Sequence, residues 1–264
     1  MIITIAVLVF FLGASFGSFY YTLAGRIIKY FYSQERKKYS FNGKIKNILL
    51  NNNSCDNCHK NLEIIETIPV LGFIINRGKC PKCQNRISFV YPVIEVIFGL
   101  EFIFVFFLTE NPVLSFAIII LSGHLLVSAV TDWKFQSLDY ENLFFIIISG
   151  FIVLWQFEEI FTITQLYIFS GFFVFYFLFW LFLRRYIGFG DVIFSPFFAV
   201  IAGHPWWLLY LNISYGLAII NTLLFRKKEE SLKNAIIPMG AYLALGLFIT
   251  LNLKIYFIYR TLHG

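Results

Sequence analysis

Long apolar stretches constrain the fold of this chain more than any other feature. The segments from Leu143 to Trp155 and from Phe172 to Leu183 contain almost no polar residue. A helix needs about 20 apolar residues to cross about 30 Å of hydrocarbon, and barrel strands would alternate polar and apolar residues, which these segments do not. Of the 264 residues, 59% are hydrophobic and 14% are charged, and the mean hydropathy is +0.74. These values exclude a soluble globular domain and predict an all-α polytopic membrane protein.

The apolar pattern predicts about eight transmembrane helices. Their approximate ranges are 2–25, 91–108, 113–131, 141–156, 163–183, 189–203, 206–225 and 237–257. The first range could instead be a signal peptide, but no Lys or Arg precedes its apolar run and no small-residue cleavage site lies before the polar loop. It is therefore interpreted as a retained helix.

The distribution of basic residues predicts the orientation. The loop from Arg26 to Arg86 holds 12 of the 21 Lys and Arg residues and four acids, so it is expected in the cytoplasm, with the N-terminus outside. Eight spans also place later basic residues inside, namely Lys134, Arg184, Arg185, Arg226, Lys227 and Lys228, and leave Lys and Arg out of loops 109–112, 157–162 and 203–205. Only Arg260, in the C-terminal tail, goes against this bias. The net charge of +6 then favours an anionic lipid leaflet and not nucleic acid as a partner.

Two acids interrupt the apolar sequence, Asp132 in Ala129–Lys134 and Asp191 in the run Gly188-Phe189-Gly190-Asp191. An acid in a membrane segment usually faces the interior of the bundle and marks a functional site. The eight-span topology places both at the cytoplasmic ends of their helices. Two carboxylates that share a site cannot easily both ionise, so the pair supplies a general base and a general acid, as in an aspartic protease. Asp191 as a helix cap, and Asp139 as the partner in place of Asp132, are the alternatives.

The loop also carries all four cysteines of the chain. Cys55 and Cys58 form one C-x-x-C pair, Cys80 and Cys83 form a second, and 21 residues separate the pairs. Four thiolates at this spacing predict a closed, tetrahedral structural zinc site. A disulfide framework is the alternative, which a reducing cytoplasmic loop disfavours. His59 could replace one cysteine as a ligand.

Further motifs stand in a fixed order along the chain. They are Gly13–Phe19 followed by Arg26, the segment GFIINRGKCPKC at 72–83, ISFVYPVIEVIFGL at 87–100, TDWKFQSLD at 131–139, GFGD at 188–191 and IPMGAYLALG at 237–246. Together they resemble the bacterial type IV prepilin peptidase family, also called prepilin leader peptidases and N-methyltransferases. The resemblance extends from about residue 13 to about residue 246.

The resemblance implies an intramembrane aspartic peptidase of the GxGD type in the bacterial inner (plasma) membrane. Such enzymes cut the leader from type IV prepilins and pilin-like secretion or competence proteins, on the cytoplasmic side and after a glycine. By position, Asp132 and Asp191 match the family's catalytic aspartates. Many members then methylate the new N-terminus with S-adenosylmethionine. The implied domains are a transmembrane helix (1–25), a cytoplasmic zinc-binding domain (26–90) and a seven-helix membrane peptidase domain (91–264).

The chain departs from the family pattern at several positions. Phe189 replaces the usual methionine, Ile193 stands where lysine is common, and Asp139 matches an accessory acid only after a one-residue deletion. Glu95 occupies the acid of the YPxxE motif, where it could hydrogen-bond the loop, assist methylation or pack as a structural acid. No Gly-rich strand-to-helix turn is present to hold S-adenosylmethionine.

Three other functions remain open from the sequence. A transporter or channel could use the acid pair as a proton relay. A protease like signal peptide peptidase or presenilin would share the GxGD chemistry, but it has no reason to carry the C-x-x-C loop. A non-catalytic scaffold for pilus assembly would keep its function without either acid.

Overall fold

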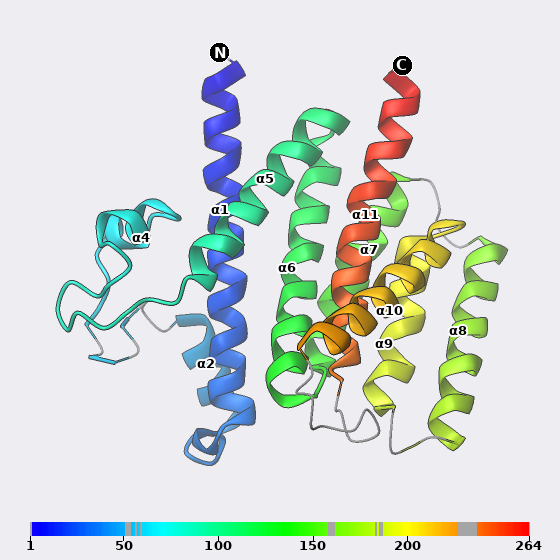
Figure 1. Ribbon diagram of the computed structural model, residues 1–264, viewed down its shortest axis with the longest axis horizontal. Coiled ribbons are helices and arrows are strands. Elements are labelled where there is room, and N and C mark those ends of the chain that lie inside the picture. The colour runs from blue at the N-terminus through cyan, green and yellow to red at the C-terminus, as the bar shows by residue number, and fades with distance from the viewer. Residues whose placement is uncertain are drawn as a thin grey trace. The chain divides into compact units, whose positions relative to one another are not determined.

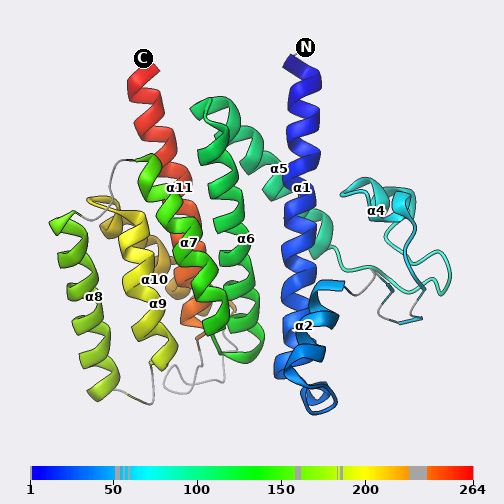
Figure 2. The same ribbon diagram turned by 180° about the vertical axis from the view of Figure 1, so that it is seen from behind.

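The computed structural model describes residues 2–50, 54–55, 57–58, 60–157, 162–182, 184, 187–225 and 237–263. Within these ranges the chain is helical and has no β-strand, only two isolated β-bridges, which confirms the predicted all-α class. The chain divides into two compact units, Met1–Phe107 and Leu108–Gly264 (Figures 1 and 2). His59, Arg185 and residues 226–228, which entered the predictions above, lie outside the described ranges.

The first unit combines two long apolar helices with short elements. Its elements are α1 (Ile2–Ile27), a π-helical turn (Ile28–Tyr32), a 3₁₀ turn (Gln34–Lys37), α2 (Phe41–Leu50), α3 (Ile64–Thr67), α4 (Leu71–Ile75) and α5 (Val90–Thr109). Glycines let α1 and α5 approach closely. A Cβ added to Gly13 would lie 2.6 Å from the carbonyl oxygen of Phe98, and one added to Gly17 would lie 2.9 Å from Phe98 Cβ. Small residues at such crossings are typical of membrane helix pairs.

The polar segment after α1 is tied back to that helix. Arg26, in the last turn of α1, donates from Nη1 to the carbonyl oxygen of Ile48 at 2.8 Å. Ile48 lies near the end of α2, where backbone carbonyls lack partners within the helix and attract cations. Arg26, which follows the Gly13–Phe19 motif in the sequence, therefore caps a second helix.

The second unit is a bundle of six apolar helices. They are α6 (Pro112–Phe135), α7 (Tyr140–Gln156), α8 (Ile163–Phe182), α9 (Phe189–Ala202), α10 (Trp206–Phe225) and α11 (Met239–His263). The end of α6 and the beginnings of α7, α9 and α11 lie at one end of this unit in both views (Figures 1 and 2). This end gathers the segments that carry the two acids.

Local sequence explains where these helices begin and end. Asn111 caps α6 by accepting the Leu114 N–H at 3.1 Å, and Pro112 occupies the first turn, where its missing N–H costs nothing. At the other end, Gln136 adopts a left-handed conformation (φ 51°) and its N–H donates to the carbonyl oxygen of Asp132 at 2.8 Å. The chain therefore turns immediately after Asp132.

Within the described residues, an apolar helix lies in each of the eight ranges predicted to span the membrane. Six of them, within the described residues, are long and apolar enough to cross a membrane, namely α1, α5, α6, α8, α10 and α11. The other two are shorter, with 17 residues in α7 and 14 in α9. At 1.5 Å per residue, α9 is about 21 Å long, which is less than the hydrocarbon thickness. Six candidate spans are thus established by length and composition, and the crossing by α7 and α9 stays a prediction.

Candidate active site and metal centre

Asp132 is buried near the end of α6 and is held by the first turn of α11. Its Oδ2 accepts the N–H of Ala241 at 2.9 Å, and the N–H of Gly240 also donates to this carboxylate. Both donors belong to the first turn of α11, where backbone N–H groups lack partners within the helix and attract anions. The N-terminus of α11 therefore fixes the carboxylate of Asp132 in place.

Asp191 is buried in the first turn of α9. Gly188 is the N-cap of this helix, and its N–H donates to the Asp191 carboxylate. An acid at this position stabilises the start of a helix, so the capping role weighed in the sequence analysis is present. Capping is not the only interaction of Asp191, because the charge of Asp132 also acts on its carboxylate. The two predicted acids, from α6 and α9, therefore lie close enough for their charges to interact.

Leu138 packs beside both acid-bearing segments. It is buried, and a Cβ added to Gly240 would lie 2.8 Å from Leu138 Cδ2, while one added to Gly190 would lie 3.3 Å from its Cδ1. Any side chain larger than glycine at residue 240 would displace this leucine. Leu138 therefore fills the space between the first turns of α9 and α11.

Asp139, the rival acid, caps α7. Its Oδ1 accepts the N–H of Glu141 at 3.2 Å, and the N–H of Asn142 also donates to it. Burial, together with the neighbouring charge of Glu141, raises the pKa of Asp139 above its usual value. These contacts give Asp139 a structural role at the start of α7.

The four predicted zinc ligands lie together in the first unit. Their Sγ atoms are all within 4.8 Å of one another, with 3.8 Å between Cys55 and Cys83 and 3.8 Å between Cys58 and Cys80. A tetrahedral site with Zn–S bonds of about 2.3 Å requires sulfur atoms about 3.8 Å apart, whereas a disulfide requires about 2.05 Å. The cysteines are free, and their arrangement fits a zinc ion.

The two C-x-x-C segments adopt matching turns. The N–H of Cys55 donates to the carbonyl oxygen of Lys60 at 2.9 Å, and the N–H of Cys80 donates to that of Asn85 at 2.9 Å. An antiparallel bridge closes each turn, Ser54 with Asn61 in the first and Lys79 with Arg86 in the second. Each turn therefore presents two sulfur atoms from the same kind of backbone loop.

Backbone N–H groups prepare the second turn for metal binding. The N–H of Asn85 donates to Cys83 Sγ and lowers the pKa of that thiol to about 6. The N–H groups of Cys83 and Lys82 likewise lower the pKa of Cys80. Metals bind the thiolate and not the thiol, so these hydrogen bonds favour the ligand form.

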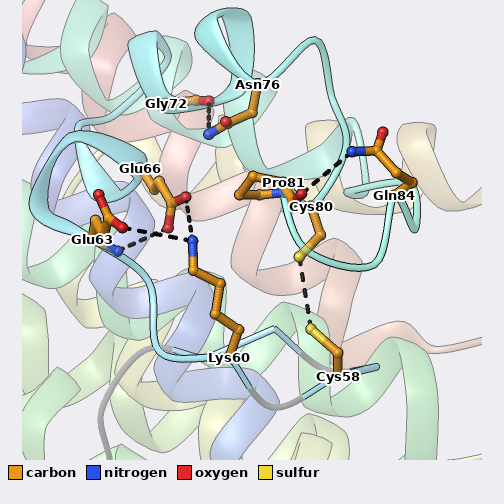
Figure 3. Close-up of polar contacts among 9 residues, drawn as sticks. All are labelled: Cys58, Lys60, Glu63, Glu66, Gly72, Asn76, Cys80, Pro81 and Gln84. Atoms are coloured by element: carbon orange, nitrogen blue, oxygen red, sulfur yellow. Dashed lines mark hydrogen bonds and ion pairs between the residues drawn. The ribbon is translucent and has the colours of Figure 1, made fainter.

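An ion pair and a backbone hydrogen bond stiffen the segment that follows the first cysteine pair (Figure 3). Lys60 Nζ donates to Glu66 Oε1 at 2.8 Å, and the N–H of Glu63 donates to Glu66 Oε2 at 2.8 Å. These contacts lower the pKa of Glu66. Lys60 lies two residues after Cys58, so the ion pair between Lys60 and Glu66 links the first cysteine turn to α3.

Glu95 joins the loop to α5. Its Oε2 accepts the N–H of Val70 at 2.7 Å, and Val70 has a positive φ of 63°, which is rare for a β-branched residue. Of the three roles left open by the sequence, the structure supplies a contact for one, the hydrogen bond to the loop. The carboxylate holds the strained residue that precedes α4.

A second polar network lies between α6 and α7, one turn before Asp132. Asn142 bridges His124 and Ser128: its Oδ1 lies 2.7 Å from His124 Nδ1, and its Nδ2 donates to Ser128 Oγ at 2.8 Å. All three side chains are buried. This network fixes the start of α7 against the helix that carries Asp132.

The roles of Gly240, Ala241 and Leu138 were not among the predictions from the sequence. The IPMGAYLALG segment was noted only as a motif, and its Pro-x-Gly-Ala start could have signalled a helix N-terminus close to another group. Leu138 carried no signal of its own. The contacts of these residues depend on packing between helices that are far apart in the chain.

Two family models match the chain. The bacterial peptidase A24 N-terminal domain matches residues 11–109, and the type IV leader peptidase family matches residues 119–223, a range that includes both Asp132 and Asp191. Together the two matches cover about three quarters of the chain. The chain belongs to the type IV leader peptidase family. The resemblance stated from its motifs is confirmed.

Individual relatives carry the same family name. A prepilin leader peptidase/N-methyltransferase of Bacillus subtilis is 30% identical over 138 residues, which cover 52% of this chain and 50% of the relative. A type 4 prepilin-like proteins leader peptide-processing enzyme of Escherichia coli O78:H11 is 28% identical over 145 residues, 53% of this chain and 54% of the relative. A prepilin leader peptidase/N-methyltransferase of Stutzerimonas stutzeri is 28% identical over 222 residues, which cover 79% of this chain and 74% of the relative.

The match with the first two relatives spans about half of their length. No solved structure matches the chain significantly.

Proposed function

We propose that this protein is an aspartic endopeptidase that removes the leader peptide from type IV prepilins and pilin-like precursors, with Asp132 and Asp191 as the catalytic pair. The observation that supports the proposal is that two buried carboxylates, from α6 and α9, lie close enough in an apolar bundle for their charges to interact. The relatives' names supply the substrate class. A structural role alone would leave the proximity of the two acids unexplained.

The proposed reaction uses one proton shared by the pair. The ionised carboxylate takes a proton from water as the water oxygen bonds to the scissile carbonyl carbon, and the protonated carboxyl gives its proton to the carbonyl oxygen. The C–N bond then breaks and the leaving nitrogen takes up a proton. The products are a leader with a new carboxyl group and a mature protein with a free amino terminus. The titration belongs to the pair and not to one residue.

The surroundings of the pair suit a substrate that bends at a glycine. Gly188 precedes Asp191 by three residues and carries no side chain that would keep a substrate backbone away. A Cβ added there would meet only Asp191 Oδ2 at 3.7 Å and the Gly190 nitrogen at 4.0 Å, whereas Leu138 occupies the space beside Gly190. The apolar helices around the pair suit the hydrophobic stem that follows the cleavage site in such precursors. Cleavage after a glycine is therefore part of the proposal.

The zinc ion and a second activity complete the proposal. Cys55, Cys58, Cys80 and Cys83 would hold a structural zinc ion, because four sulfur ligands leave no open position for catalysis. N-methylation of the new amino terminus with S-adenosylmethionine is supported by the relatives' names. We assign it no residues.

The proposed location is the bacterial inner membrane, with the N-terminus outside and the acids facing the cytoplasm. The asymmetry of Lys and Arg between loops supports this orientation. Alkaline phosphatase fused after Glu110 should be active, since that enzyme folds only outside the cytoplasm, and a fusion after Ser137 should be inactive. The opposite pattern would reverse the orientation.

Cleavage of a prepilin-like peptide by the purified protein in lipid tests the catalytic pair. The peptide carries a basic leader, a glycine and an apolar stem. We expect Asp132→Asn and Asp191→Asn to lower the cleavage rate by about 10²- to 10⁴-fold, the range for loss of general acid–base catalysis. Asp139→Asn is the matched control, because asparagine also caps helices well, and it should retain most activity.

Other outcomes would overturn parts of the proposal. Loss of cleavage in Asp139→Asn with activity in Asp132→Asn would identify Asp139 as the second acid. A wild-type protein that never cuts the peptide but conducts ions across the membrane would support the transporter alternative.

A further inference from the structure

Four hydroxyl groups gather between α8, α9 and α10, one helical turn from Asp191. Ser195 lies four residues after Asp191 and so on the same face of α9, Tyr176 comes from α8, and Tyr210 and Tyr215 come from α10. Ser195 and Tyr210 are 0% exposed and Tyr176 is 1% exposed. No role in the proposed catalytic chemistry has been given to any of them. The cluster lies inside the second unit.

The hydroxyls are close to one another and to Asp191. Tyr176 Oη lies 2.9 Å from Tyr215 Oη, and Ser195 lies beside the hydroxyls of both Tyr176 and Tyr210. The charge of Asp191 acts on Tyr210 and on Tyr215. Tyr215 is 38% exposed, so the cluster extends from the neighbourhood of the acid to the surface of the bundle.

Two of these hydroxyls make no hydrogen bond of good geometry, although Ser195 lies within reach of the Tyr176 and Tyr210 hydroxyls. Among the described residues, neither Ser195 Oγ nor Tyr210 Oη has a protein partner in hydrogen-bonding geometry, although both atoms are fully buried. An unpaired buried hydroxyl destabilises the folded state, and native structures rarely leave such groups without a partner. The chain also offers an easy alternative: Ser149 and Ser214, equally buried serines, bond to carbonyl oxygens four residues back in their own helices. Ser195 does not.

The hydroxyl groups of the cluster indicate what kind of molecule it can bind. Hydroxyl groups both donate and accept hydrogen bonds and carry no charge, so they suit a small neutral molecule better than an ion. A buried water molecule needs two to four polar partners, which Ser195, Tyr210 and Tyr176 can provide. The hydrolysis proposed above consumes one water molecule for each bond cut, and Ser195, Tyr176 and Tyr210 are buried beside one of the two acids.

We propose that the hydroxyls of Tyr176, Ser195, Tyr210 and Tyr215 form a water-binding site that holds water next to Asp191 and supplies it to the reaction. This inference rests on the proposed function for its catalytic part, but water binding itself does not. Water reaches the pair from the side of Ser195 and loses its proton to the ionised member of the pair when it attacks the scissile carbonyl carbon.

Ser195→Ala and Tyr210→Phe test the site, and Ser149→Ala is the matched control. Each change removes one buried hydroxyl. If the hydroxyls served packing alone, deletion of an unpaired group would leave activity intact and keep or raise the midpoint of thermal unfolding. We expect instead that Ser195→Ala and Tyr210→Phe lower kcat by at least tenfold, with KM within about twofold and the unfolding midpoint unchanged or higher. Ser149→Ala should keep the wild-type kcat.

A second measurement detects the water without substrate. Radiolytic labelling of the lipid-embedded protein in ¹⁸O-water oxidises aromatic side chains that lie beside bound water. Tyr210 should be labelled in the wild type and lose its label in Ser195→Ala. Tyr20, a buried tyrosine of α1, should stay unlabelled in both proteins.

The two measurements separate the possible failures. Full kcat in both hydroxyl variants, or an unlabelled Tyr210 in a wild-type protein that cuts the peptide, would overturn the water site. A labelled Tyr210 in a protein that cuts no prepilin-like peptide would retain the water site and overturn the proposed function.

Discussion

Single residues in this protein are held mainly by backbone groups of distant segments. Asp132 accepts N–H groups from the first turn of α11, and Glu95 accepts the N–H of Val70. Asp132 and Glu95 thus each accept a backbone N–H group, which no substitution of the donor residue except proline removes. Their positions therefore depend on where the donor helix or loop lies, and only weakly on the side chains around them.

Glu95 yields a prediction that separates a structural role from a role in methylation. Glu95→Ala leaves the N–H of Val70 without its acceptor, at a cost of about 1–3 kcal/mol, so the loop should release zinc to a chelator faster than in the wild type. Glu95→Gln keeps an acceptor oxygen and should lie near the wild type. Unchanged zinc release in both variants, together with loss of methylation, would instead place Glu95 in methyl transfer.

Among single residues, the sequence predicted those whose side chains have a distinctive chemistry. The four cysteines stand out because their spacing suits one metal ion, and the two acids stand out because apolar sequence surrounds them. Gly240 and Ala241 could not be found in this way, because their contribution comes from N–H groups that every residue but proline possesses. The unpaired hydroxyls of Ser195 and Tyr210 likewise become visible only when three helices are packed.

Among the elements, the turn between α6 and α7 controls the spacing of the site. Gln136 ends α6 in a left-handed conformation, Asp139 caps α7, and Leu138 between them packs against Gly190 and Gly240. A short, doubly fixed turn thus holds one leucine between two helix starts. We infer that Leu138 sets the separation of α9 from α11.

A double-mutant cycle that enlarges residue 240 and shortens residue 138 tests this role. Gly240→Ala places a methyl group against Leu138 and should destabilise the protein by about 1–3 kcal/mol, and Leu138→Ala should cost about 2–5 kcal/mol through the space it leaves. The double variant should recover part of the loss, with a coupling energy of about 0.5–3 kcal/mol in thermal unfolding and a matching recovery of cleavage. Strictly additive effects would show that the two residues act independently.

The long helices could be predicted within a few residues, whereas the short ones could not. Asn111 with Pro112, and the run from Gly188 to Asp191, mark the starts of α6 and α9 in the sequence itself. In contrast, the segment around Phe41–Leu50 appeared to be a polar loop, and α2 forms there with its end held by Arg26. The brief helices α3 and α4 depend on contacts with Lys60 and Glu95, which no local pattern reveals.

At the scale of the whole molecule, the chain consists of two units with different sources of stability. The second unit buries apolar side chains along six helices. The polar part of the first unit, which contains the short helices α3 and α4, has the four sulfur atoms in place of a large core. Small loop-rich segments of this kind commonly depend on a bound metal.

Metal removal should therefore affect the two units unequally. A strong chelator should expose the amides of residues 60–88 to hydrogen exchange, because structural zinc supplies about 10–16 kcal/mol in zinc-finger peptides, while the amides of α6 and α9 keep their protection. Cys83→Ser should have the same effect without a chelator, and Ser88→Ala should not. Equal loss of protection in both units would show that the metal supports the entire fold.

The hold of α11 on Asp132 has a consequence for biosynthesis. Residues 240 and 241 leave the ribosome more than one hundred residues after Asp132, and after every other helix of the bundle. Until they arrive, the carboxylate lacks its two N–H donors and Leu138 lacks one of the surfaces against which it packs. If the two acids act as proposed, a nascent chain carries both of them without a finished catalytic centre, and hydrolysis of peptide bonds has to wait until the last helix is in place.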